Sequence, residues 1–262
     1  MIMRGVKIVL CCLSFVLFLL SAFLLHVAGV FFSHHRWKML SGLNKIYAWS
    51  LRMIAGVRIV VKGREHIPRS AGYLVISNHL TYLDGVVLGS IFPVIYLSKK
   101  AIKKWPGINW MVSISGTIFI DRERKSASLE SIDAIVKRLR QRANVLLFPE
   151  GTSTNGDKLK EFQSVFFAAP LMTQSLIVPV IIRYRKVNNE PVTHSNRHSI
   201  YWWGQIPFQN HLYQLLRMKS IDAQVDVLPA VETEKFQNSS IGRKELAKYA
   251  YDIINAESCA PA

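Results

Sequence analysis

The sequence predicts an α/β fold in which a mixed, mainly parallel sheet is flanked by helices, preceded by a membrane helix or a two-helix membrane motif. Three observations support it: a long uncharged apolar run near the amino terminus, short apolar runs alternating with helical stretches after Gly56, and polar motifs directly after apolar runs. A chain of 262 residues is long enough for one such domain with an appended segment. We therefore divide it into membrane-anchoring helices at residues 1–56 and an α/β domain at residues 57–262.

The amino-terminal run predicts a membrane helix. No Lys, Arg, Asp or Glu occurs from Ile8 to Phe32, and a helix of this length reaches about 37 Å, enough to cross a hydrocarbon core of roughly 30 Å. The run is too long for the apolar region of a cleaved signal peptide, so we expect a retained anchor. Basic residues lie on both sides of it, so the charge bias does not decide its orientation.

A second helix is predicted from Trp37 to Ile54. Its apolar residues recur at helical spacing among aromatic and basic residues, a mixture that suits a membrane interface. Two arrangements remain open. Two helices entering one leaflet would explain the basic residues at both ends of the apolar run, and one spanning helix followed by an ordinary surface helix is the alternative.

After Gly56, apolar and β-branched runs predict strands, and longer periodic stretches predict helices. The strands are expected at Arg58–Lys62, Tyr73–Ser77, Val94–Ser98, Thr117–Ile120, Val145–Phe148 and Ile177–Ile182. The helices are expected at Asp84–Ile91, Lys99–Ser113, Ser126–Arg142, with Ser126 as N-cap, and Glu161–Gln174. A loop at Glu190–Arg197, a strand at Tyr201–Trp203, a helix near His211–Met218, a strand at Asp222–Leu228 and a closing helix at Ile241–Asn255 complete the domain.

The composition points to acidic partners at a membrane. Apolar residues make up 50% and charged residues 19% of the chain, and the formal charge is +16. A field of that sign attracts anionic bilayers, nucleic acids and phosphorylated substrates. No basic-aromatic motif of a nucleic-acid module occurs, so we expect an anionic membrane surface and no nucleic acid. Three cysteines without metal-ligand or disulfide spacing predict neither a metal site nor a disulfide framework.

His79 and Asp84 are the strongest candidates for a catalytic pair. The segment from Asn78 to Asp84 follows an apolar run and leads into a predicted helix, so both side chains are expected at the carboxyl end of the sheet, where open α/β folds bind ligands. A histidine can remove a proton from a hydroxyl when a carboxylate fixes its tautomer and stabilises the imidazolium. This spacing is common by chance, however, and a surface histidine beside an acid at a helix start is the simpler interpretation of it alone.

Other polar groups also follow apolar runs. In the segment Phe148 to Ser153, Gly151 lets backbone amides approach an anionic group or a developing oxyanion closely. Arg122 could grip a phosphate bidentately at the same edge of the sheet. Lys99, Lys100, Lys103 and Lys104 form a basic cluster that suits acidic head groups. The simpler interpretations are a plain turn and solvated charges.

Two enzyme classes are excluded by their motifs. No G-x-S-x-G serine elbow is present, which argues against a covalent acyl-enzyme of the hydrolase kind. Asp157 stands where a phosphate loop between Gly151 and Gly156 would need its lysine, which excludes nucleotide triphosphate binding of that type.

Together these segments resemble the glycerolipid acyltransferase family typified by 1-acyl-glycerol-3-phosphate acyltransferases, whose four sequence blocks occur here in the family's order. The Asn-His-x4-Asp block matches Asn78, His79 and Asp84, the Gly-x-x-Phe-x-x-Arg block matches Gly116, Phe119 and Arg122, the Phe-Pro-Glu-Gly-Thr block matches Phe148 to Thr152, and a looser proline block matches Val178-Pro179-Val180. The resemblance covers about residues 57–185 and makes residues 57–262 an acyltransferase domain.

The resemblance implies transfer of a fatty acyl group from acyl-CoA or acyl carrier protein to the free hydroxyl of a lysolipid, without a cofactor. By similarity, His79 is the general base and Asp84 its orienting partner. Contacts with the acceptor's head group are implied for Arg122 and for a lysine of the Lys99–Lys100 pair. The implied acceptor site also includes Glu150, Gly151 and Thr152.

One departure from the family pattern concerns the acceptor. Many members that acylate lysophosphatidate have arginine directly after Glu-Gly-Thr, where this chain has Ser153. Members with serine or threonine there resemble lyso-ornithine-lipid acyltransferases and general lysophospholipid acyltransferases. We rank 1-acyl-glycerol-3-phosphate first, because Arg122 and the lysines could compensate its charge, and lyso-ornithine lipid or another lysolipid second.

Two further hypotheses compete with an enzyme. A basic membrane-surface protein with an inactive acyltransferase fold would bind lipid without turning it over, but His79, Asp84 and Glu150 are intact. A nucleic-acid-binding protein fits least well, because the apolar anchor places the basic surface beside lipid. Juxtamembrane basic residues are attracted to anionic lipid, so we expect the protein at the cytoplasmic face of the inner membrane.

Overall fold

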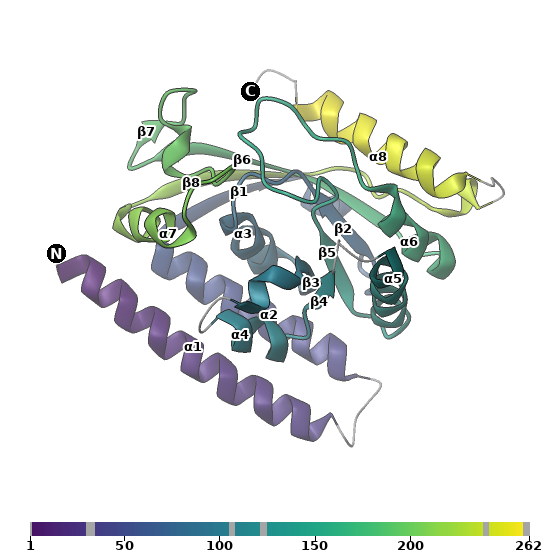
Figure 1. The fold of residues 1–262 in the computed structure, drawn as a ribbon, viewed down its shortest axis with the longest axis horizontal. Helices are drawn as coiled ribbons and strands as arrows, with labels where there is room; N and C mark the ends of the chain where they lie inside the picture. Colours follow the sequence, from purple (N-terminus) through teal and green to yellow (C-terminus); the bar gives the residue numbers. More distant parts are fainter. Residues whose placement is uncertain (1, 30–34, 105–107, 121–124, 238–240, 259–262) are drawn as a thin grey trace.

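The computed structural model describes residues 2–29, 35–104, 108–120, 125–237 and 241–258. Its centre is a mixed, mainly parallel sheet with strand order β1-β8-β6-β2-β5-β3-β4, and β7 pairs with β6 at the side (Figure 1). The strands are β1 (Val57–Lys62), β2 (Leu74–Ser77), β3 (Val94–Lys99), β4 (Ile118–Ile120), β5 (Asn144–Leu147), β6 (Ile177–Val187), β7 (Glu190–Pro191) and β8 (Ile221–Val227). Among the strand pairs of the described residues, β6–β8 and β6–β7 are antiparallel and the others are parallel. The predicted fold class is confirmed.

The central strands read as continuous apolar runs because helices cover both faces of the sheet. One face packs against α5 (Lys125–Arg140), α6 (Ala168–Thr173) and α8 (Gly242–Ser258). On the other face lie α3 (Leu83–Ile91) and α7 (Phe208–Arg217). Every residue of β2 and of β5 is buried. The two neighbouring strands that carry the candidate site therefore lie in the most enclosed part of the molecule.

The amino-terminal helices form an antiparallel hairpin against the α/β body. Helix α1 (Ile2–Ala28) packs along α2 (Arg36–Ala55), with Ser14 bonded to Ser50 at 2.6 Å. Near one end of α1, Lys7 Nζ donates to the carbonyl oxygens of Ala55 at 3.2 Å and Met218 at 2.7 Å. Near its other end, His26 Nε2 donates to the carbonyl of Ile114, in α4 (Ile108–Ile114), at 2.8 Å. Both ends of α1 therefore contact the α/β body.

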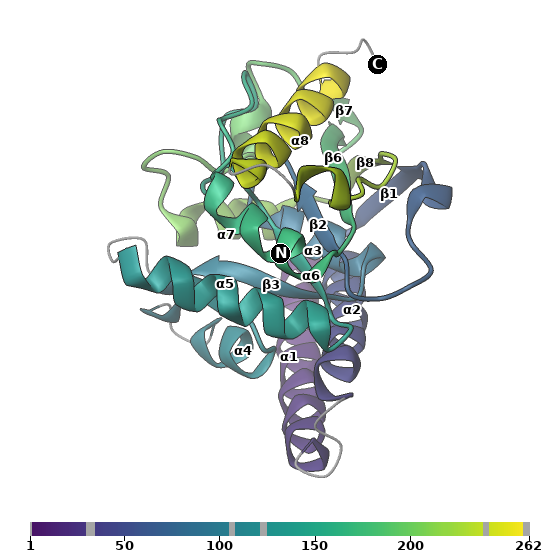
Figure 2. The same ribbon diagram turned by 90° about the vertical axis from the view of Figure 1, so that its right-hand side faces the viewer.

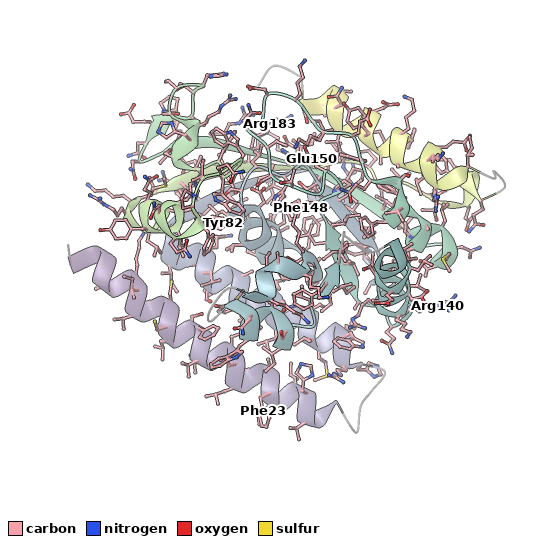
Figure 3. The ribbon with its side chains drawn as sticks, in the orientation of Figure 1. Phe23, Tyr82, Arg140, Phe148, Glu150 and Arg183 are labelled. Atoms are coloured by element: carbon pink, nitrogen blue, oxygen red, sulfur yellow. The ribbon has the colours of Figure 1, made fainter. Side chains whose placement is uncertain are left out.

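The outer face of this hairpin is apolar. Helix α1 is long and apolar enough to cross a membrane, by length and composition, and its exposed residues include Leu24 and Phe23, which is 60% exposed and projects away from the body (Figure 3). Figure 2 shows the hairpin extending from the side of the molecule opposite α8. A surface of this composition is unfavourable in water, so it requires an apolar environment.

Four predicted elements are corrected. Lys99–Ser113 is not one helix: β3 continues to Lys99, a short 3₁₀ helix follows at Lys100–Lys104, and α4 begins at Ile108, consistent with a proline at position 106. The helix predicted at Glu161–Gln174 is limited to a 3₁₀ turn at Ser164–Phe167 and to α6, because Pro170 is tolerated only in a first helical turn. Ser126 lies inside α5 and so is not an N-cap.

The fourth correction concerns Tyr201–Trp203, which is not a strand. Its aromatic residues have high β-propensity, but propensity for strands measures packing on a half-buried surface and not pairing as such. Here the backbone N–H of Trp202 donates to the carbonyl of Leu80 at 2.9 Å. The segment therefore crosses over the loop that carries His79, where it helps to enclose the candidate site.

Candidate active site

The candidate site lies where β2 and β5 end side by side. These strands are parallel neighbours, with Leu74 opposite Val145 and Ile76 opposite Leu147. His79 follows the end of β2, and Glu150 follows the end of β5. Because the carboxyl ends of parallel strands meet at one edge of the sheet, two motifs far apart in the sequence converge there.

His79 and Asp84 form a hydrogen-bonded pair. His79 Nδ1 lies 2.9 Å from Asp84 Oδ2. Since an ionised carboxylate only accepts hydrogen bonds, Nδ1 carries the proton, and the lone pair of the neutral ring is on Nε2. Asp84 is completely buried, whereas the His79 side chain is 19% exposed. The pair is therefore arranged for the ring to accept a proton from a ligand while the carboxylate stays out of solvent.

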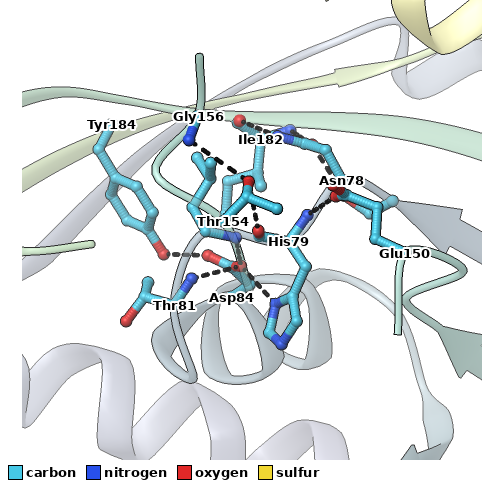
Figure 4. A network of polar contacts seen from close by, with 11 residues as sticks. Asn78, His79, Thr81, Asp84, Glu150, Thr154, Gly156, Ile182 and Tyr184 are labelled. Atoms are coloured by element: carbon cyan, nitrogen blue, oxygen red, sulfur yellow. Dashed lines mark hydrogen bonds and ion pairs between the residues drawn. The ribbon is translucent and has the colours of Figure 1, made fainter. Parts of the chain in front are cut away.

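The carboxylate of Asp84 is held by three further donors (Figure 4). The backbone N–H groups of Leu80 and Thr81 donate to Oδ2 at 2.7 Å and 2.9 Å, because Asp84 lies in the first turn of α3. The hydroxyl of Tyr184, in β6, donates to Oδ1 at 2.8 Å. Burial, followed by the negative charge of Asp84, raises the pKa of Tyr184 well above its usual range, so the phenol stays protonated and donates.

The backbone that carries His79 is fixed from both sides. Asn78 bridges to β6 by donating to the carbonyl of Ile182 at 3.1 Å and accepting from its N–H at 2.9 Å. Glu150 accepts from the His79 N–H at 2.7 Å and from the Lys160 N–H at 3.0 Å. Burial raises the pKa of Glu150, and the hydrogen bonds from these two amides oppose that shift. The His79 ring also stacks on Phe148, with centroids 4.1 Å apart.

His79 opens into a cavity of about 490 Å³ between the sheet and the amino-terminal helices. Its wall is mainly apolar and aromatic and includes Tyr47, Leu51, Val86, Met111, Phe148 and Trp202. In Figure 3, Tyr82 and Phe148 lie on opposite sides of α3, with Tyr82 toward α7. A cavity with apolar walls and one reactive polar edge suits a hydrocarbon chain that ends in a polar group.

Of the six predicted substrate-binding residues, five lie in the described part of the chain, and three of these line the cavity. Lys99, Gly151 and Thr152 line the cavity together with His79, and Gly151 has a left-handed φ of 75°, which favours glycine at this turn. Glu150 is 5% exposed, and its carboxylate faces the two backbone amides. Lys100 is exposed and is not among the lining residues, and Arg122 lies outside the described residues. The substrate contacts of all six stay predictions.

Sequence reasoning missed Tyr184 and the aromatic wall formed by Tyr82 and Trp202. Tyr184 is 100 positions from Asp84 in the sequence, and it lies between Arg183 and Arg185, beyond the proline block and the predicted apolar run of that strand. Trp202 lies on the cavity wall, in the segment Tyr201–Trp203 for which the sequence predicts a strand. No sequence signal points to Tyr184, because the pairing of β6 with β2 that brings it toward the catalytic edge is known only from the structure.

Comparison with known proteins decides the family. Residues 58–183 match the family described as Acyltransferase. The lyso-ornithine lipid O-acyltransferase of Rhodobacter capsulatus is 31% identical over 202 residues, which cover 74% of this chain and 67% of that protein. The chain belongs to the acyltransferase family. The predicted resemblance is confirmed, and the protein is an acyltransferase.

Other relatives of this acyltransferase carry two different names. A lyso-ornithine lipid O-acyltransferase of Rhizobium meliloti is 29% identical and aligns with 75% of this chain and 68% of its own length. The 1-acyl-sn-glycerol-3-phosphate acyltransferase of Borreliella burgdorferi is 27% identical and aligns with 80% of this chain and 77% of its own length. The crystal structure of the 1-acyl-sn-glycerophosphate acyltransferase PlsC from Thermotoga maritima matches with a TM-score of 0.61 and 20% identity, over 97% of this chain and 96% of that one. That last match shows the fold, including the amino-terminal helices.

Tyr184→Phe tests whether the buried hydroxyl positions the acyltransferase pair. We expect kcat to fall about tenfold, because hydrogen bonds to charged groups contribute about 1.5–3 kcal/mol and only part of this reaches His79 through Asp84. KM for the acceptor should change little, since Tyr184 is buried behind Asp84. Tyr201→Phe is the matched control, because Tyr201 packs beside Tyr184 with centroids 6.1 Å apart. Equal kcat values for the two variants would exclude a positioning role.

Proposed function

We propose that this acyltransferase moves a fatty acyl group from an acyl-CoA or acyl carrier protein thioester to the free hydroxyl of a lysolipid, in phospholipid or related membrane-lipid synthesis. The observation that carries the proposal is the His79–Asp84 pair, bonded at 2.9 Å, whose histidine lies on the wall of a mainly apolar cavity. The apolar cavity fits a fatty chain, and the pair fits deprotonation of a hydroxyl.

In the proposed mechanism, His79 Nε2 takes the proton from the acceptor hydroxyl as that oxygen attacks the thioester carbonyl. Asp84 stabilises the imidazolium that forms. When the tetrahedral intermediate collapses, the carbon–sulfur bond breaks and the leaving thiolate takes the proton from His79. The products are the acylated lipid, the free thiol of the donor and neutral His79, so no covalent acyl-enzyme, cofactor or metal ion is required.

Two acceptors have support from separate observations. Lys99 on the cavity wall suits the phosphate of 1-acyl-glycerol-3-phosphate. Ser153, also on that wall, stands where the phosphate-specific pattern has arginine, and relatives named lyso-ornithine lipid O-acyltransferases are 29% and 31% identical to this chain. Both acceptors present a hydroxyl beside a long acyl chain, so the same pair and cavity serve either.

The amino-terminal helices are proposed to hold the enzyme on one leaflet. Both ends of α1 contact the α/β body. If α1 crossed the bilayer, part of the polar α/β body would therefore have to lie within the bilayer. An orientation in which the apolar face of the α1–α2 hairpin enters one leaflet avoids this cost and opens the catalytic cavity beside the lipid. We propose the cytoplasmic face of the inner membrane, where the basic surface meets anionic lipid.

An acyl-transfer assay on the purified full-length protein tests the proposed function. Labelled acyl-CoA and labelled acyl carrier protein are each offered with 1-acyl-glycerol-3-phosphate, a neutral lysolipid and lyso-ornithine lipid, and His79→Ala is the control. Product formed with one acceptor and absent from the control would establish both the reaction and the substrate. A correctly folded protein without product in any pairing would favour the lipid-binding, non-catalytic hypothesis.

Ser153→Arg tests the head-group preference. A guanidinium on the cavity wall can pair bidentately with a phosphate, so we expect kcat/KM for 1-acyl-glycerol-3-phosphate to rise about tenfold relative to lyso-ornithine lipid. Ser153→Gln, which has similar length without charge, is the control. An unchanged ratio between the two acceptors in the arginine variant would show that charge at this position does not limit phosphate recognition.

A further inference from the structure

A second cavity, of about 400 Å³, lies at the opposite edge of the sheet from His79. Its inner wall is formed where the strands begin: Tyr73 precedes β2, Pro93 precedes β3, and Asn144 begins β5. The catalytic residues follow the ends of β2 and β5, so the sheet separates the two cavities. Helix α2 contributes to both, with Asn44, Ala48 and Leu51 facing the catalytic cavity and Lys45 and Arg52 facing the second one.

The second cavity is strongly cationic. Lys45, Arg52, Arg64 and Arg69 line it, and no carboxylate is among the described residues of its wall. None of the four forms an ion pair with a described residue. The Nε of Arg52 is buried and has no hydrogen-bond partner in the described part of the chain. A buried guanidinium N–H without an acceptor costs free energy, so this wall is complementary to an anion that supplies one.

The part of the cavity wall that α2 forms adjoins the apolar surface of that helix. Lys45, Trp49 and Arg52 follow one another at intervals of four and three residues, so they share one side of the helix. Trp49 is 51% exposed, and Ile46 and Met53, on the adjoining side, are 65% and 53% exposed. An aromatic and aliphatic stripe next to a basic one is typical of a helix lying at the level of lipid head groups.

We infer that this cavity, which we call the α2 anion pocket, binds the phosphate of an anionic phospholipid of the bilayer, separately from the catalytic site. The acyl chains of that lipid would lie along the stripe of Ile46, Trp49 and Met53, while Lys45 and Arg52 reach its phosphate. The adjacent apolar stripe favours a membrane lipid over a soluble phosphate, which would gain nothing from that surface. The inference rests on the membrane orientation proposed above.

Lipid retention by the full-length protein tests the α2 anion pocket. The purified protein in detergent is titrated with phosphatidylglycerol, with phosphatidylcholine and with inorganic phosphate. The detergent is then removed in the mass spectrometer, and the molecules that stay bound are counted by native mass spectrometry. We expect one retained phosphatidylglycerol, and roughly 30-fold weaker retention in Lys45→Gln/Arg52→Gln, from the attraction of two basic residues to anionic lipid. Arg64→Gln/Arg69→Gln is a second variant. The side chains of Arg64 and Arg69 are exposed, so these substitutions affect folding less.

The matched control is Arg243→Gln/Lys244→Gln, which removes the same charge from exposed positions on α8, on the far side of the sheet. Acyl transfer in detergent should stay unchanged in all three variants, so failure of the pocket is distinguishable from failure of the enzyme. Equal retention of phosphatidylglycerol by control and pocket variants would overturn the inference. So would tighter binding of inorganic phosphate than of lipid, or a raised KM for acyl-CoA, which would indicate a soluble ligand or the donor.

Discussion

His79→Ala is expected to abolish measurable acyl transfer while the protein stays folded and membrane-attached. Among the described residues of the catalytic cavity wall, His79 is the titratable ring bonded to a buried carboxylate, and a positioned general base contributes about 10²–10⁴-fold to a rate. Its side chain is 19% exposed, and within the described part of the chain it donates to Asp84 alone, so we expect its removal to leave the strands and their helices intact. Initial rates with saturating donor and acceptor measure the effect.

The control for this variant is His66→Ala. His66 Nδ1 donates to the carbonyl of Val227 at 2.8 Å, and His66 is not among the described residues that line the catalytic cavity, so the variant also removes an imidazole with one hydrogen bond. Its rate should remain near that of the unmodified enzyme, and both variants should float equally with vesicles. Full activity of His79→Ala under these conditions would refute the proposed general base.

Asp84→Asn is expected to lower kcat by roughly 10³–10⁴-fold with little loss of stability. An asparagine oxygen in place of Oδ2 can still accept from His79 Nδ1 and from the N–H groups of Leu80 and Thr81. Its amide nitrogen can then donate to the hydroxyl of Tyr184 in place of the bond that Oδ1 now accepts. The hydrogen-bond pattern survives, but the negative charge that stabilises the imidazolium is gone.

Asp84→Ala is the informative comparison, because it removes the charge and the hydrogen bonds together. It leaves the two buried backbone N–H groups without an acceptor, at a cost of about 1–3 kcal/mol each, so its Tm should fall well below that of the asparagine variant. Thermal unfolding followed by circular dichroism measures this, and single-turnover rates measure the chemistry. An asparagine variant that keeps its activity would show that the charge of Asp84 is not needed.

The contact between His79 and Asp84 could be predicted from the sequence because the two residues lie close together along the chain. His79 and Asp84 are joined by one turn and the start of α3, so the residues between them nearly fix their distance. The central strands could be predicted equally well, since burial on both faces produces continuous apolar runs. Such runs can be recognised without knowing which strands pair with them. Motif order along the chain also sufficed for the family, which the comparisons confirm.

The sequence by itself thus determined the α/β class, the family and the local contact of His79 with Asp84. Tertiary structure decided that Tyr184 holds the far oxygen of Asp84, that Trp202 closes over the site, and that Lys45 and Arg52 face a cavity away from the catalytic one. Periodicity reports which face of an element is apolar, but it does not identify the element that covers that face. Those partners lie far apart in the sequence and are brought together only when the sheet and its helices pack.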